Sequence, residues 1–135
     1  MKITHTLTAL VALIALSGCT TPTRQHMRIA NVKLAESEQK MAAGEWTQAT
    51  ALAEEAGAEV KLGIEARPIR KGAGGGDLDM TPLFAAWLNG PHHELVSALG
   101  ANQAERATAA FAATRQQCAN CHIAVGRPTI PVSGL

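Results

Sequence analysis

Cys118-Ala119-Asn120-Cys121-His122 stands near the end of the chain, in a segment whose apolar residues recur at helical spacing. C-x-x-C-H is the attachment sequence for c-type haem: the two thiols bond to the haem vinyl groups, and the adjacent imidazole ligates the iron. Two intervening residues place both sulfurs on one side of a helical turn. The motif therefore predicts one covalently bound haem c, attached through Cys118 and Cys121, with His122 as the proximal iron ligand.

Two other interpretations of the C-x-x-C pair find little support elsewhere in the sequence. A structural zinc site needs a second pair of ligands, and the only other cysteine, Cys19, is far away along the chain. A thioredoxin-like redox pair needs a βαβ context, and no segment alternates with the period of a strand. We therefore favour haem attachment over a zinc site or a redox dithiol.

The third cysteine, Cys19, ends a stretch with the anatomy of a signal peptide. A basic residue precedes an apolar run over 7–16 that is too short to span a bilayer. The sequence L-S-G-C over 16–19 resembles a bacterial lipobox, which implies cleavage before Cys19 and its acylation as a membrane anchor. We expect export to the periplasmic side of a bacterial membrane, and Thr20, where an Asp would favour the inner membrane, favours the outer one. An ordinary secretory signal with a chance cysteine is the alternative.

These assignments use all three cysteines, so we expect no disulfide. We divide the chain into a signal peptide (1–18), a lipidated tether (19–23), one helical domain (24–127) and a C-terminal tail (128–135).

Twelve basic residues against eleven acidic ones give no reason to expect nucleic-acid binding. Aromatic residues are scarce and Ala is abundant, which favours closely packed helices among which a haem supplies apolar bulk.

Four segments show apolar residues at helical spacing. They cover about 24–43, about 45–65, a third segment from 81 to about 99 that breaks at Asn89-Gly90-Pro91, and a fourth from about 104 through the haem motif. Thr81 is the predicted N-cap of the third, and Asn102 with Glu105 resembles a capping box for the fourth. Short links between four helices predict an all-α fold, an antiparallel up-down-up-down four-helix bundle with the haem near the end of helix 4.

The Gly-rich run 71–77 joins the second and third helices. It lacks the Lys-Ser/Thr of a phosphate-binding loop, so we expect a flexible connection. The sequence also shows no Ser-His-Asp or paired-carboxylate constellation, and we do not expect an enzyme.

In this layout the mature chain resembles the class II c-type cytochromes, whose type member is cytochrome c-prime. The resemblance is carried by the four helices, the Gly-rich link and the position of Cys118–His122 near the end of the last helix. It implies a haem-binding bundle that either transfers electrons or, with an open sixth iron site, binds nitric oxide or carbon monoxide. Where the family often has an Arg followed four residues later by a Met or Leu, Arg24 is followed by Met27 at three and Arg28 at four.

In such a bundle the start of the first helix lies level with the end of the fourth. Met27 is therefore a candidate sixth iron ligand, with core packing as the alternative, and His26 is a second candidate that we more readily expect to face solvent. Arg24 and Arg28 lie at a helix N-terminus, where the macrodipole does not account for basic residues, so they are candidate contacts of a haem propionate.

Several further expectations follow from the same placement. Basic residues gather near the haem end of the predicted bundle, Arg115 among them, while Glu38 and other acidic residues lie toward its middle or far end. His92 and His93 are expected to be exposed and remote from the iron. We expect one-electron transfer with a redox partner protein, and the position of the anchor favours a partner that is itself membrane-bound. Gas binding is the rival function, and a structural haem in a docking lipoprotein is a third alternative. A homodimer through the first two helices is left open.

Overall fold

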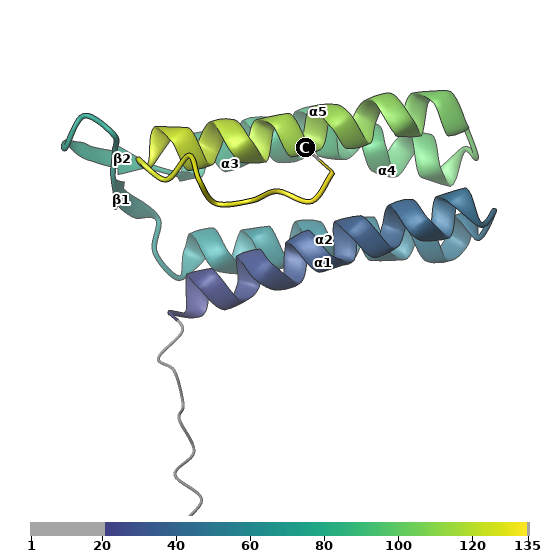
Figure 1. Cartoon of the computed structure of the whole chain (residues 1–135), viewed down its shortest axis with the longest axis horizontal. Coiled ribbons are helices and arrows are strands. Elements are labelled where there is room, and N and C mark those ends of the chain that lie inside the picture. The colour runs from purple at the N-terminus through teal and green to yellow at the C-terminus, as the bar shows by residue number, and fades with distance from the viewer. Residues whose placement is uncertain (1–20, 135) are drawn as a thin grey trace, which may run out of the picture.

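The computed structural model describes residues 21–134, which are largely helical with one small two-stranded sheet (Figure 1). The all-α prediction is confirmed at this coarse level. The predicted signal peptide and the lipid site Cys19 lie outside the described residues and stay predictions. Within residues 21–134, no helix has the length and apolar character needed to cross a membrane.

The first two helices, α1 (Pro22–Ala42) and α2 (Trp46–Glu65), follow the predicted segments closely. Helix α1 starts two residues before the predicted Arg24, because Pro22 occupies its first turn with a pre-set φ and no unsatisfied N–H. The predicted tether over 19–23 therefore ends inside a helix. Between α1 and α2 the chain turns at Gly44, whose φ of +76° is readily adopted by glycine.

The prediction of a flexible Gly-rich connection is wrong. Strands β1 (Ile69–Lys71) and β2 (Asp77–Asp79) pair antiparallel, and Lys71 faces Asp77 with 2.6 Å between Nζ and Oδ1. The loop between them also bonds to the last helix, since the N–H of Ala73 donates to the carbonyl of Ala124 at 2.8 Å. A three-residue strand is too short for its alternation to be recognised in sequence.

The third predicted segment is a kinked rod built of α3 (Thr81–Trp87), a π-helical turn η1 (Leu88–His92) and α4 (His93–Gly100). The break predicted at Asn89-Gly90-Pro91 is present as a kink at Gly90, whose φ of −104° and ψ of −107° are not helical. Thr81 is not the N-cap, which is Met80; instead the backbone N–H of Thr81 donates to the Asp79 carboxylate at 2.9 Å.

The prediction that His92 is exposed is also wrong, whereas His93 is exposed as expected. After the kink at Gly90 the His92 ring lies against α2, where Nε2 is 2.9 Å from the carbonyl oxygen of Ala53. The ring occupies space that Gly57 leaves free, because a Cβ on Gly57 would stand 2.6 Å from His92 Cε1. The sequence predicts a break just before His92 but does not indicate which way the ring turns after it.

The last helix, α5, spans Ala104–Ala124 and carries the C-x-x-C-H motif in its second half. The predicted capping box does not form, since the N-cap is Gln103 and no side chain bonds to the free N–H groups there. Asn102 instead adopts the left-handed conformation, with φ of 55°, just after α4 ends. This is a conformation that asparagine tolerates better than other side chains do.

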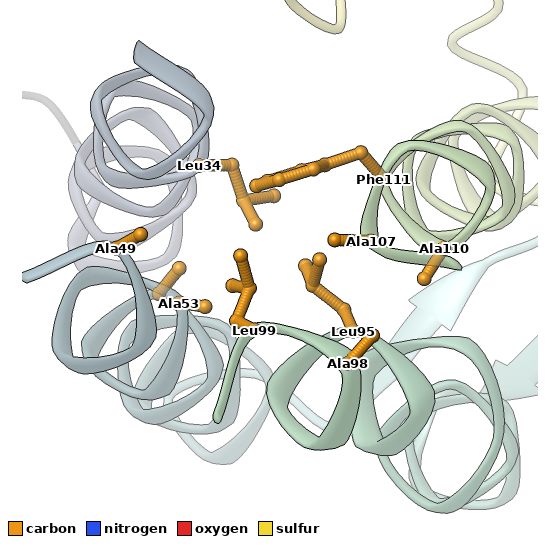
Figure 2. Packing of buried hydrophobic residues seen from close by; sticks show 10 residues of the cluster. Leu34, Ala49, Ala53, Leu95, Ala98, Leu99, Ala107, Ala110 and Phe111 are labelled. Carbon is orange, nitrogen blue, oxygen red and sulfur yellow. The ribbon is translucent and has the colours of Figure 1, made fainter. Parts of the chain in front are cut away.

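The helices form two antiparallel pairs, α1 with α2 and the α3–α4 rod with α5 (Figure 1). Helix α2 packs against α4, whereas α1 makes few contacts with α5. Figure 2 shows the apolar core between the pairs, where Leu34, Leu95, Leu99 and Phe111 converge with small alanines. The core draws on the first halves of α2 and α5 and on α4, so it lies in the half of the molecule away from the motif.

Candidate functional site

The opposite end of the molecule holds the C-x-x-C-H motif. Figure 1 places the start of α1, the end of α2, the β-hairpin and the last turns of α5 together there, and we call this region the motif end. Cys118 and Cys121 are one turn apart on α5, partly buried and free of any disulfide bond. His122 follows immediately and is also partly buried.

Burial keeps both thiols protonated. Desolvation, followed by the proximity of Cys121, raises the pKa of Cys118 to about 11, and desolvation also raises the pKa of Cys121. A redox-active dithiol has the opposite character, because its attacking sulfur is a thiolate with a lowered pKa. Among residues 21–134, no three His, Cys, Asp or Glu side chains are grouped as metal ligands.

The imidazole of His122 has a defined hydrogen-bond partner. Its Nδ1 lies 3.4 Å from the carbonyl oxygen of Ile130, and since a carbonyl only accepts, Nδ1 is the protonated nitrogen. Burial lowers the pKa of His122, so the ring is neutral near pH 7 and Nε2 carries the free lone pair. Metal-binding histidines characteristically donate their second N–H to such an acceptor. The ring is thus in the tautomer that an iron ligand needs.

Aromatic side chains of α3 border the motif. Trp87 is buried, and its Nε1 donates to the carbonyl of Thr114 on α5 at 3.3 Å. Phe84 stacks on Trp87 with 6.1 Å between ring centroids, and the His92 ring, tilted by 32°, lies with its centroid 4.5 Å from that of Trp87. These contacts fix the Trp87 indole beside the helical turn that carries Cys118.

Apolar side chains at the motif end are only partly covered, in contrast to the closed core at the other end. They come from α1, α2, the hairpin and α3, and comprise Met27, Val60, Ile64, Leu78, Leu83 and Phe84. Half-buried apolar surface around two cysteines and a correctly tautomeric histidine fits a bound macrocycle with a large apolar face. The residues present therefore fit the covalent haem that the motif predicts.

The two candidate sixth ligands both engage α2. The His26 Nδ1 lies 2.7 Å from the Glu59 carboxylate, so this side chain is half-buried and paired, contrary to the expectation that it faces solvent. The Met27 ε-methyl packs at the surface of Gly63, where an added Cβ would stand 2.9 Å from it. The structure brings both residues to the motif end and leaves the sixth ligand as a prediction.

Basic residues at the motif end fall into two groups. Arg24 and Arg28 are exposed on α1 and make no ion pair with any other residue in the described range 21–134. Arg70, on the hairpin, has its pKa lowered by burial and then by the nearby charges of Arg67 and Arg127. Sequence reasoning placed these last three at the haem end, but it proposed propionate contacts for Arg24 and Arg28 alone. The cluster is suited to a carboxylate-bearing ligand.

Arg115 differs from these residues because its charge is paired with a carboxylate of the protein. It is buried and forms a two-pronged ion pair with Glu38 of α1, which sequence reasoning had placed apart from it. Sequence reasoning also missed the contact of the tail with His122 through Ile130. Gly126 and the prolines after it predict that the helix ends there, but nothing in the sequence indicates where the following residues go.

Comparison of the chain with protein-family models, with curated proteins and with solved structures gives no match.

Proposed function

We propose that this chain is a monohaem c-type cytochrome of the class II kind, with an antiparallel up-down-up-down four-helix bundle around one haem c. In this proposal it transfers single electrons on the periplasmic side of a bacterial membrane, to which acylated Cys19 anchors it. The observation that carries the proposal is the C-x-x-C-H motif at the end of α5, with His122 Nδ1 engaged by Ile130 so that Nε2 is free.

Each residue then has a defined task. Cys118 and Cys121 hold the haem through thioether bonds, and His122 Nε2 binds the iron. The bound haem supplies the one-electron chemistry between Fe(III) and Fe(II). The partly buried apolar side chains of the motif end exclude water from the macrocycle. Arg24 and Arg28, together with the cluster Arg67, Arg70 and Arg127, offset the negative charge of the propionates.

A second function, binding of nitric oxide or carbon monoxide at an open sixth position, is supported by the side chains of His26 and Met27. His26 is paired with Glu59, and Met27 packs on Gly63, so each has a partner on α2 without an iron ligand role. Electron transfer remains the favoured proposal, because α1 begins at the motif end and so keeps Met27 and His26 as candidate sixth ligands. Ligation by Met27 would give a higher reduction potential than ligation by His26.

The placement of the anchor suggests where the partner lies. The described chain is helical from Pro22, so few residues separate Cys19 from the motif end. Basic side chains at that end would face anionic headgroups, a position suited to electron exchange with a membrane-bound redox protein. A second copy of this chain, docked through α1 and α2, is an alternative partner.

The test is production of the full-length chain in a bacterium that makes c-type cytochromes. We expect a mass increase of one haem that survives denaturation, and a reduced spectrum of the c type. Replacing Cys118 and Cys121 by Ala abolishes both. As the matched control, Cys19→Ala keeps the haem and lacks the mass of the acyl chains. A wild-type chain without covalent haem overturns the proposal, whereas a reduced spectrum that shifts with carbon monoxide favours gas binding.

A further inference from the structure

After α5 the chain reverses direction and runs back over that helix. Gly126 makes the turn with φ of +68°, and the N–H of Arg127 donates to the carbonyl of His122 at 2.8 Å. Residues 127–134, which we call the strap, then lead from the level of His122 to that of Arg115 (Figure 1, yellow).

Polar contacts hold the end of the strap. Asn31 of α1 donates from Nδ2 to the Ser133 hydroxyl at 2.8 Å and accepts the Ser133 backbone N–H at 2.9 Å. Gly134 lies directly on the Arg115 guanidinium, because an added Cβ would be 2.7 Å from Arg115 Cζ. The strap therefore bridges α5 and α1, which otherwise touch little.

Apolar burial accounts for little of this path, since Val132 is the only apolar side chain of the strap that is partly buried. The side chain of Ile130 is 42% exposed, and the prolines on either side are exposed too. The part of the strap that faces inward at Ile130 is its backbone carbonyl, which accepts the His122 Nδ1–H. Because Ile130 is exposed and the polar atoms of the strap bond to α5 and α1, we attribute the position of the strap to these hydrogen bonds.

We propose that the strap positions His122, and that Asn31 and Ser133 are the residues that keep it in place. The inference rests on the proposed function, because it assigns the strap a role toward the iron ligand. An acceptor on Nδ1 fixes the tautomer and ring orientation and raises the basicity of Nε2. A more basic ligand favours the oxidised iron, so the strap lowers the reduction potential.

The experiment compares holoprotein variants by hydrogen exchange and by reduction potential. Asn31→Ala removes both bonds to Ser133 while favouring the helix. We expect at least a tenfold loss of protection at the Ser133 amide and a shift of the potential to a higher value. Ser133→Ala, which removes one of the two bonds, shifts the potential in the same direction by less.

Two controls separate positioning from general loosening. Ser133→Thr keeps the hydroxyl and restores the wild-type potential, and Thr129→Ala, at an exposed strap position, leaves both readouts unchanged. If the Ser133 amide loses its protection but the reduction potential does not change, the strap does not position His122. If the Asn31→Ala protein keeps full protection at that amide, Asn31 does not hold the strap. A wild-type chain without covalent haem refutes the proposed function and this inference with it. That result is distinct, because it is seen before any variant is compared.

Discussion

Arg115 of α5 donates two hydrogen bonds to the carboxylate of Glu38 of α1, at 3.1 and 2.6 Å. The Arg115 side chain is 5% exposed and that of Glu38 40% exposed, so the cation is enclosed while its partner reaches solvent. The guanidinium also lies 5.2 Å above the centre of the Phe111 ring. This single pair joins α5 to α1 at the boundary between the apolar core and the motif end.

The first prediction concerns this enclosed cation. Glu38→Gln removes its counter-charge, and hydrogen bonds to charged groups contribute about 1.5–3 kcal/mol, so we expect a loss of unfolding free energy in that range. The measurement is urea unfolding of the mature chain. The control, Glu94→Gln, breaks a pair with Arg106 in which both side chains are about half exposed, and costs at most about 1 kcal/mol. Equal effects of the two substitutions would contradict the enclosed-cation interpretation.

The second prediction follows from the pH response of the same carboxylate. Its hydrogen bonds with Arg115 lower the pKa of Glu38 below its ordinary 4.5, with desolvation opposing and the Arg115 charge reinforcing the shift. The stabilisation is therefore complete above pH 4.5 and is lost as the pH falls through the lowered value. Urea unfolding of the wild type and Glu38→Gln between pH 6 and 2.5 checks this. The two curves should converge toward acid, and a constant difference would refute the assignment.

The third prediction concerns buried His92. Desolvation lowers its pKa below 6.5 and outweighs the opposing hydrogen bond to Ala53. The folded state favours the neutral ring, so its contribution is complete above pH 6.5 and declines as the pH falls toward the lowered value. His92→Gln keeps a donor but cannot titrate. We expect the wild type to lose stability relative to this variant between pH 7 and 5, measured by urea unfolding. His93→Gln, at an exposed position, should track the wild type throughout.

The fourth prediction tests the close approach of α2 to the π turn. Gly57→Ala would place a Cβ 2.6 Å from the His92 ring, and the ring is held between α2 and Trp87. Overpacking of this kind costs about 1–3 kcal/mol. Gly100→Ala is the matched control, because a Cβ at that helical position meets nothing within 4 Å. It should leave stability unchanged or raise it by up to about 1 kcal/mol. A tolerated Gly57→Ala would show that the ring moves aside freely.

Features that depend on residues near one another in the sequence were predicted, whereas features that depend on contacts between distant residues were not. The four helical segments were recognisable because periodicity repeats over many residues. The hairpin was not, since each strand has only three residues. The inward position of His92 follows a kink at Gly90, and the direction of that kink is not encoded in the periodicity. Met27 and His26 were correctly brought to the motif end, but their pairing with α2 depends on Gly63 and Glu59, which no local pattern connects to them.

The candidate site shows the same division. The spacing of Cys118, Cys121 and His122 is local and carries its chemistry in the sequence itself. The acceptor on His122 is the carbonyl of Ile130, which belongs to the strap. Asn31 bonds to the end of the strap at Ser133, which lies 102 positions later in the sequence. Only a folded chain reveals such a contact. Arg67, Arg70 and Arg127 likewise form a cluster only because the hairpin returns to the end of α5.

The last prediction concerns haem removal. The closed core includes Ala53, Leu99 and Phe111, all fully buried, whereas the motif end has partly exposed apolar side chains. Regions with few buried contacts open at lower free energy than the core. The chain with Cys118 and Cys121 replaced by Ala should therefore exchange amide hydrogens faster in the last two turns of α5 than the holoprotein does. Amides around Phe111 should keep their protection.

Hydrogen exchange followed by mass spectrometry of peptides from the two halves of α5 measures this difference. Ile123→Ala, an exposed position beside the motif, serves as the control and should leave the exchange of both halves of the holoprotein unchanged. If haem loss instead slowed or left unaltered the exchange of the motif end, that end would be ordered by its own side chains. If both halves lost protection equally, the apolar core would depend on the haem for its stability, contrary to the separation seen here.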